Sequence, residues 1–520
     1  MKTRVLHSFK KTSFGWFFLV SQLLAPEASS NDDAEFWGDW SRLIYTYDKP
    51  LIDSDRFLLS YDDFSIEREL ALTIEALKSD KTLVCRYPAR STFLESHGLL
   101  EPISFDHCND LMEYLEKVPM DSMHYVFASE NLDSVTSMMG HGFLVAKGED
   151  ASGITREHTF SFFAELGGGN PLTLFYQSMV SGMDGQFMVR PYWRDLQRYS
   201  EVEEREVWDY ELKLSPEELS LLKLALWELN GVRPTYLFHS FNCATLTLYA
   251  IGINDDGMED YDVLFVSPLD IVKGIHFENK VARTAVQLPP GVGAIIAERG
   301  AVALKDLDSE TLLSVKDPMR IPQDSLVTAS FSHNGFNLGF LPASHLLRTA
   351  SFDRNASSEL TIGEVNFSSD SGLEEFLLYG FKNYIPITEH SSSLSSEFYV
   401  GINNQGIDTR KEMMGEAMWL GGQTHYWNGY QISLLAGGGA NEIGSYLATR
   451  LSVSRHFSPE LKFNFYTLVK GFEGGRRWQE DVLEVSMLAA SRWTLFVSGT
   501  RREFGTRQHS YATIGVDFHF

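Results

Sequence analysis

A cysteine and a histidine in favourable local settings are the residues of this chain best suited to nucleophilic chemistry. Cys243, one of three cysteines in 520 residues, lies in the stretch YLFHSFNCATLTLYAIGI. Asn242 is a favoured N-cap residue and apolar residues follow at helical spacing, so the pattern predicts a helix with Cys243 in its first turn. The unpaired N–H groups and the helix dipole there favour a thiolate, the nucleophilic form of cysteine.

A thiol nucleophile needs a base, and two histidines are candidates. His141 lies in SVTSMMGHGFLVAKG, between a Ser/Thr-rich turn and an apolar strand, and its glycine neighbours permit close approach of the backbone. His239 lies only four residues before Cys243, although that spacing does not guarantee contact. A buried, inert cysteine is the alternative, because free cysteines are often buried.

The two remaining cysteines, Cys85 and Cys108, are 23 residues apart on either side of a loop. The chain opens with basic residues, the apolar run FGWFFLVSQLLA and small residues, which is typical of a signal peptide over residues 1–30. In an oxidising compartment Cys85 and Cys108 can therefore form a disulfide, which leaves Cys243 as a free thiol.

The elements that must position these residues fall into four regions after the signal peptide. Residues 31–120 predict a small helical module, and residues 121–260 predict a mixed domain of strands and two final helices. The segment SPEE predicts the start of the first of those helices, with Ser215 as N-cap and Glu218 as its capping-box partner. Residues 261–325 predict a connecting region of a few strands and turns.

From residue 326 to residue 520 the pattern changes to about ten to twelve short segments that alternate apolar and polar residues. A soluble sandwich would alternate in the same way. Aromatic residues near the segment ends and the final strand YATIGVDFHF, which ends in Phe520, favour an outer-membrane β-barrel whose assembly requires the outer-membrane assembly machinery. The fold class is therefore α+β, a thiol domain preceded by a helical cap and followed by an antiparallel barrel.

Composition excludes several function classes. The net charge of −26 argues against a nucleic-acid partner, which would need a basic face. Neither C-x-x-C nor H-E-x-x-H spacing occurs, so no metal site is expected. Because GGGNP lacks the strand-turn-helix context of a phosphate-binding loop, no nucleotide cofactor is expected either.

Three ordered motifs resemble the periplasmic domain of the Lnb-type lipoprotein N-acyltransferases over about residues 80–255. SMMGHGFLV resembles the family's S-M-F-G-H-T-F-L-R signature, and YLFHSFNCATLTL resembles its F-F-D-x-N-C block, with Asn242 and Cys243 matching. The segment RPYWRDLQRYSEVEEREVWDYELKLSPEELSLLKLALWEL, which contains Arg205, is similar to the central block, and CRYPAR is similar to a module that precedes the domain.

The resemblance implies a permuted papain-like thiol fold, related to NlpC and lecithin:retinol acyltransferase-type enzymes, in which His141 activates Cys243 for acyl transfer through a thioester. Ser137, Asn242, Glu211 or a backbone carbonyl could orient the histidine. Arg205 could bind an anionic group of the substrate or form a buried ion pair with Asp209 or Glu211.

The expected function is an envelope acyltransferase or acyl hydrolase that acts on lipoprotein or phospholipid acyl groups, in the outer membrane of a Gram-negative cell with the thiol domain in the periplasm. Two alternatives remain. One is a papain-like amidase or protease, and the other is a non-catalytic outer-membrane scaffold that retains the cysteine.

Overall fold

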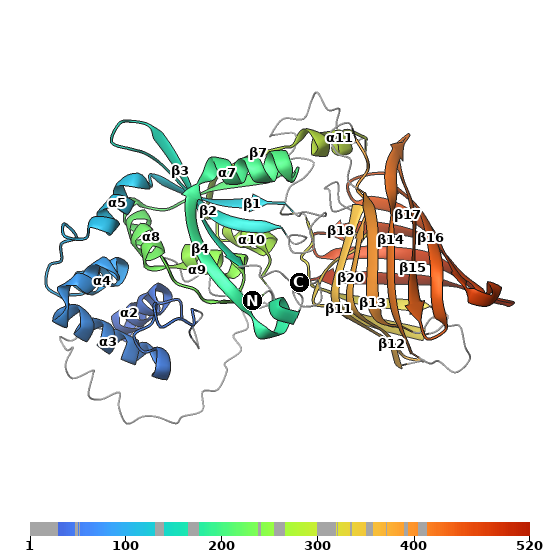
Figure 1. The fold of residues 1–520 in the computed structure, drawn as a ribbon, viewed down its shortest axis with the longest axis horizontal. Coiled ribbons are helices and arrows are strands. Elements are labelled where there is room, and N and C mark those ends of the chain that lie inside the picture. The colour runs from blue at the N-terminus through green and yellow to red at the C-terminus, as the bar shows by residue number, and fades with distance from the viewer. Residues whose placement is uncertain are drawn as a thin grey trace.

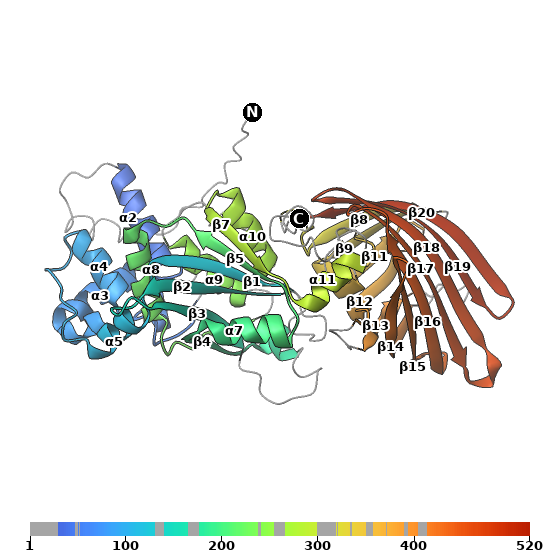
Figure 2. The same cartoon turned by 90° about the horizontal axis from the view of Figure 1, so that it is seen from above.

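The computed structural model describes residues 30–46, 50, 52–129, 140–164, 176–237, 241–253, 266–298, 319, 321–332, 335–349, 357–370, 372–388, 394–403 and 413–520. The predicted signal peptide lies outside them, apart from Ser30. Figures 1 and 2 show a helical module, a central sheet domain and a barrel arranged one after the other along the longest axis. The predicted α+β class and the order of these parts are confirmed.

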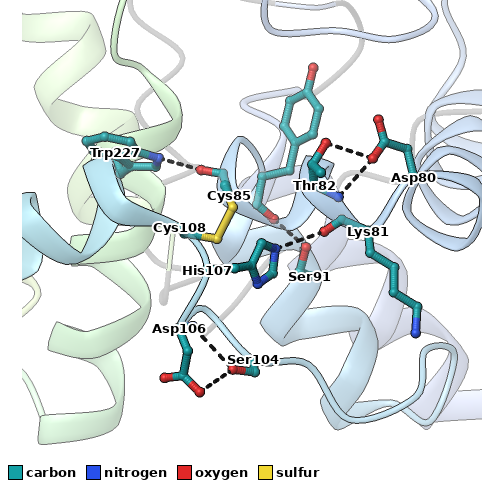
Figure 3. The surroundings of a disulfide bond; sticks show 11 residues. Asp80, Lys81, Thr82, Cys85, Ser91, Ser104, Asp106, His107, Cys108 and Trp227 are labelled. Atoms are coloured by element: carbon teal, nitrogen blue, oxygen red, sulfur yellow. Dashed lines mark hydrogen bonds between the residues drawn. A yellow bond between two sulfur atoms is a disulfide. The ribbon is translucent and has the colours of Figure 1, made fainter.

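Four helices form the N-terminal module, as the sequence predicted. They are α2 (Ser30–Leu43), α3 (Ile66–Ser79), α4 (Pro88–Ser96) and α5 (Asn109–Lys117). A disulfide between Cys85 and Cys108, also predicted, joins the segments that precede α4 and α5 (Figure 3). Trp227 of α8 (Pro216–Glu228) donates a 2.8 Å hydrogen bond to the carbonyl of Cys85 and so ties the module to the central domain.

A buried arginine adds a second tie between the module and α8. Arg90 of α4 is completely buried, and its guanidinium lies 2.9 Å from both Glu69 of α3 and Glu228 of α8. The same guanidinium stacks over Phe57, 4.4 Å from the ring centroid. Removing one partner of such a group would leave buried charge without compensation, so the cluster fixes how the module packs on the domain.

The central domain is built on a seven-stranded antiparallel sheet in the order β6-β4-β3-β2-β1-β5-β7. Its strands are β1 (Ser122–Ala128), β2 (His141–Glu149), β3 (Thr155–Ala164), β4 (Met183–Pro191), β5 (Val207–Leu212), β6 (Thr235–Tyr236) and β7 (Val281–Gln287). Because side chains alternate between the faces of a strand, β1 and β2 supply residues to two separate cores.

On one face, Tyr125, Phe127, Leu144 and Ala146 pack with α8, α9 (Cys243–Gly252) and α10 (Pro268–Phe277). On the other face, Val126 and Phe143 pack with Tyr192 and Tyr199, which belong to α7 (Tyr192–Gln197) and the following π-helical turn η5 (Arg198–Val202). Figure 1 shows α7 on the side of the sheet away from α9 and α10.

The connecting region differs from the prediction of a few strands and turns. Its described part contains α10, the strand β7, which extends the central sheet by pairing with β5, and α11 (Pro290–Glu298). Ser267 caps α10 in a full capping box with Asp270, the same device that SPEE provides at the start of α8. The prediction missed the helix α10 because it did not take S-P-x-D at residues 267–270 as a helix start.

The C-terminal part is a closed antiparallel barrel. Its strands are β8 (Leu326–Ser332), β9 (Gly335–Leu341), β11 (Ser358–Ser368), β12 (Gly372–Asn383), β13 (Ser395–Asn403), β14 (Met414–Trp427), β15 (Tyr430–Asn441), β16 (Gly444–His456), β17 (Leu461–Phe472), β18 (Arg477–Ala490), β19 (Trp493–Phe504) and β20 (Arg507–His519). Strand β9 pairs with β11 and closes the ring, which gives twelve strands. The short β10 (Ala343–His345) continues β9 beyond Pro342 and also pairs with β11.

Side-chain orientation distinguishes this barrel from a soluble sandwich. Leu434 and Leu447 are 64% and 79% exposed on the outside, whereas Arg450, Lys470 and Glu416 are buried inside. Lys470 and Glu416 form a 2.6 Å ion pair within the barrel. An apolar exterior around a polar interior suits lipid, in which a closed barrel satisfies every backbone hydrogen bond. No described helix has the length and apolar character needed to cross a membrane.

Candidate functional site

Cys243 is the first residue of α9, as the sequence predicted, and Asn242 is its N-cap. The Asn242 carboxamide oxygen accepts a 3.0 Å hydrogen bond from the N–H of Thr245, and its nitrogen donates a 3.1 Å bond to the carbonyl of Val266. The Thr245 hydroxyl oxygen in turn accepts a hydrogen bond from the Asn242 N–H, which completes a capping box. Both ends of the amide are therefore used, and the first turn of the helix is held firmly in place.

The thiol of Cys243 is only 9% exposed and lies against backbone donors. Burial raises the pKa of the thiol above its usual value, while the N–H groups of Gly142, Ala244 and Cys243 itself and the charge of Arg205 lower it in part. The resting form at neutral pH is therefore the protonated thiol. The same N–H groups would stabilise negative charge on the sulfur or on an oxygen bound beside it.

His141 is the first residue of β2, and its ring packs among aromatic residues. It stacks on Phe163, with ring centroids 5.0 Å apart, and lies 5.9 Å from Tyr199. Burial lowers the pKa of His141 to about 3, and the nearby arginines add to this effect. Its Nε2 is buried and has no hydrogen-bond partner among the described residues. The imidazole is therefore neutral, and the described part of the chain supplies no partner for its Nε2.

The thiol and the imidazole lie on opposite faces of the sheet. His141 faces Tyr199, whereas the next residue, Gly142, presents its N–H to the sulfur on the α9 side. No hydrogen bond joins Cys243 and His141 in the described part of the chain. Their backbones are nevertheless close, because the N–H of Gly142, the residue after His141, acts on the Cys243 thiol and lowers its pKa in part.

The strands also separate at this point. The pairing of β2 with β3 ends at Leu144 and Phe160, so the ladder between these two strands does not reach Gly142 or His141. The thiol and the imidazole therefore lie on opposite faces of the sheet, at the end of β2 that is not paired with β3.

Two tyrosines complete the surroundings of the thiol, the buried Tyr125 and the half-buried Tyr236, and neither was predicted. The Tyr125 hydroxyl donates a 2.8 Å hydrogen bond to the carbonyl of Pro268, and it would lie 2.2 Å from a Cβ on Gly142. A side chain at position 142 is therefore incompatible with this packing. Burial raises the pKa of the Tyr236 hydroxyl well above its usual value, and the nearby Cys243 raises it further. The alternation of β1 could have placed Tyr125 on this face, but no local pattern pointed to Tyr236.

Arg205 is buried near the site but pairs differently from the prediction. Its guanidinium forms a 2.9 Å ion pair with Glu203 and donates to the carbonyls of Ala128 and Ser129, at the end of β1. The predicted pairing with Asp209 or Glu211 is wrong. Both carboxylates lie further along β5 and have other cationic partners, whereas Glu203 precedes the strand together with Arg205.

Of the remaining predicted site residues, only Glu211 belongs to the described part of the chain, and it lies away from the thiol. Ser137 and His239 lie outside the described residues. Glu211 forms a 3.1 Å ion pair with Arg283 and sits opposite His124 on β1, whereas His141 sits opposite Ala128. Four residues of strand separate these positions, about 13 Å. The third member of a catalytic set therefore stays unassigned.

Comparisons with known proteins agree with this architecture. The model of the Lnb N-terminal periplasmic domain matches residues 110–276. Compared with the predicted resemblance over about residues 80–255, the match begins later, so that CRYPAR lies outside it, and it reaches further, into α10. A comparison with curated proteins found no match.

Solved structures similar to this chain include the KdgM porin, which is 13% identical with a TM-score of 0.25 and covers 38% of this chain and 98% of its own. The NanC porin is 7% identical with a TM-score of 0.26, and LpxR from Salmonella typhimurium is 12% identical with a TM-score of 0.23. Each of these two covers 38% of this chain and 100% of its own. At these identities the likeness concerns the barrel fold alone. The chain thus combines a region that matches the Lnb N-terminal periplasmic domain, at residues 110–276, with a C-terminal twelve-strand barrel.

Proposed function

We propose that the periplasmic domain is a thiol-dependent acyltransferase or acyl hydrolase with Cys243 as its nucleophile. The observation that supports this most directly is the position of the sulfur, in the first turn of a capped helix and facing the backbone N–H groups of Gly142 and Ala244. Such donors stabilise the negative charge that develops on a carbonyl oxygen during acyl transfer.

His141 is the proposed general base. Its unsatisfied Nε2 is neutral and able to accept a proton, and its backbone adjoins the residue that contacts the sulfur. Because the ring lies on the other face of the sheet, proton transfer requires one bridging water at the open end of the β2–β3 pair or a movement of the ring through it. Catalytic hydrogen bonds are often long or misaligned before substrate binds.

The reaction would proceed in two balanced steps. The thiol proton passes to His141 as the sulfur bonds to the acyl carbonyl carbon, and the alcohol leaving group departs with that proton when the tetrahedral intermediate collapses to a thioester. An amine or water then attacks the thioester, loses its proton to His141 and releases Cys243 as the thiol.

Acyl groups of lipoproteins or phospholipids are the proposed substrates. The C-terminal end of β1, where His141 and Arg205 lie, points toward the barrel in Figure 1. On the barrel side, Gln323 donates a 3.2 Å hydrogen bond to Asp270 of α10. This end of the domain is thus close to the membrane in which acyl lipids are found.

A non-catalytic scaffold is the second candidate, and the resting site offers a specific argument for it. A thiol whose pKa is raised, beside a histidine that makes no hydrogen bond to it, resembles an inert buried cysteine more than a preformed ion pair. An amidase or protease that uses the same thiol is the third candidate. The outer-membrane assembly machinery remains the proposed partner for insertion of the barrel.

Intact-protein mass spectrometry would separate these candidates. Full-length protein in detergent is incubated with diacylated lipopeptides or phospholipids, beside Cys243→Ala and His141→Gln variants. A fatty-acyl mass increment that is labile to hydroxylamine and absent from Cys243→Ala is the expected result. Labelling of Cys243 by a peptide electrophile without acyl transfer would favour the amidase, and inertness toward both reagents would favour the scaffold.

A further inference from the structure

A serine, a histidine and an aspartate form a connected group at the other end of the central sheet. Ser122 and His124 lie on β1, two residues apart and therefore on the same face, and Asp209 reaches them from the neighbouring strand β5. Ser122 begins β1, whereas Ala128, the partner of His141, ends it. Six residues of strand, about 20 Å, therefore separate this group from the thiol end of the sheet.

The hydrogen bonds of the group form a chain through the imidazole. The Ser122 hydroxyl lies 3.0 Å from Nε2 of His124, and Nδ1 of His124 lies 2.5 Å from a carboxylate oxygen of Asp209. The second oxygen of Asp209 accepts a 2.7 Å hydrogen bond from the ammonium of Lys147. Both ring nitrogens are thus engaged, one with a hydroxyl and the other with a carboxylate.

The carboxylate determines which nitrogen carries the proton. Burial raises the pKa of Asp209, but the hydrogen bonds from His124 and Lys147 lower it further, so the group is ionised. An ionised carboxylate can only accept, so Nδ1 of a neutral His124 carries the hydrogen and Nε2 presents its lone pair to the Ser122 hydroxyl. This is the hydrogen-bond pattern of a serine activated by a histidine and an aspartate.

The nucleophile remains accessible to solvent. His124 is 3% exposed and held between its partners, while Ser122 at the start of the strand is only half-buried. The surface around it is charged: Lys147 also pairs with Glu157 at 3.5 Å, and Arg283 pairs with Glu211 nearby on β5. A polar, short-chain ester fits such a rim better than a long acyl chain, which would need apolar contacts.

We propose that Ser122 is a second nucleophile of this protein, activated by His124 and oriented by Asp209, which hydrolyses small polar carboxylic esters. The Ser122 proton passes to Nε2 of His124 as the serine oxygen bonds to the carbonyl carbon, and the alcohol departs with that proton. Water then donates a proton to His124 and its oxygen to the acyl group, which leaves as the acid and restores Ser122.

The test uses full-length Cys243→Ala protein in detergent, so that the thiol cannot contribute. A fluorophosphonate probe is added, and the modified residue is located by peptide mass spectrometry. We expect labelling at Ser122 that disappears in Ser122→Ala and slows at least about 100-fold in His124→Gln, the usual contribution of a general base. Asp209→Asn should slow labelling as well, and Asp209→Glu should restore part of the rate.

The chain supplies a matched control. The Ser96 hydroxyl lies 3.3 Å from Nδ1 of His97 on the surface, and the same nitrogen lies 2.8 Å from the Phe93 carbonyl. A nitrogen that donates to a carbonyl carries the hydrogen and therefore cannot take the serine proton. Ser96 should stay unlabelled, and Ser96→Ala should not change the rate at Ser122. Absence of label at Ser122 in the folded protein would overturn the proposal, and so would labelling that persists unchanged in His124→Gln.

Discussion

Removing the N-cap of α9 should loosen the candidate site without changing the thiol itself. Asn242→Ala deletes the acceptor for the Thr245 N–H and the donor to the Val266 carbonyl, both in buried surroundings. Loss of an N-cap costs about 1 kcal/mol, up to about 2. A buried carbonyl left without its partner costs about 1 kcal/mol more. The expected total is about 2 to 3 kcal/mol of local stability.

Cys243 is itself the reporter for this prediction, because the other two cysteines are joined in a disulfide. Thiol alkylation under native conditions measures how often the start of α9 opens, and a loss of about 2 to 3 kcal/mol should raise the rate about 30-fold to 160-fold. Ser215→Ala removes the cap of the more exposed α8 and should leave the alkylation rate nearly unchanged. An equal effect of both substitutions, or an Asn242→Ala effect below about threefold, would refute the assigned role of the cap.

Three further predictions concern stability and reactivity. Arg90→Ala leaves two buried carboxylates without a cation and should lower the free energy of unfolding of the periplasmic part by about 3 to 5 kcal/mol in urea titrations. Reduction of the disulfide between Cys85 and Cys108, which are separated by 23 residues, should cost about 3.5 kcal/mol, measured as the shift of the same transition in dithiothreitol. Because the pKa of Cys243 is raised, its alkylation rate should still increase about tenfold per pH unit between pH 7 and pH 9, and a plateau below pH 8 would contradict the buried thiol.

Local signals in the sequence predicted those parts of the structure that depend on local chemistry. Asn242 predicted the start of α9, because a cap acts on residues within one turn. The disulfide between Cys85 and Cys108 was predictable because the chain contains only one other cysteine. The alternation after residue 326 predicted the barrel strands, since the period of two is a property of each strand alone. The closing contact between β9 and β11 could only come from the folded chain.

Contacts between distant segments account for what the sequence did not predict. Arg205 could have met any of several nearby acids, and only the packing at the end of β1 selected Glu203. The sequence identified both the histidine and the cysteine of the motif. Their placement on opposite faces depends on the position of His141 as the first residue of β2, because successive side chains of a strand point to opposite faces. A shift of one residue would have reversed it.

The two candidate nucleophiles lie at opposite ends of the central sheet, Ser122 at the start of β1 and Cys243 of α9 beside Gly142, and this arrangement gives them different surroundings. The thiol end is buried and directed toward the barrel, where Gln323 links Asp270 of α10 to the barrel strand that carries His519, through bonds of 3.2 Å and 3.0 Å. The Ser122 end is charged, and Ser122 itself is only half-buried.

The Gln323 contacts join α10 of the central domain to the last barrel strand, so they tie the thiol end of the sheet to the barrel. A hydrophobic acyl chain and a small polar ester would then meet different nucleophiles for a geometric reason. Loss of the Gln323 contact should impair chemistry at the thiol on membrane-embedded substrates while leaving labelling of Ser122 unchanged.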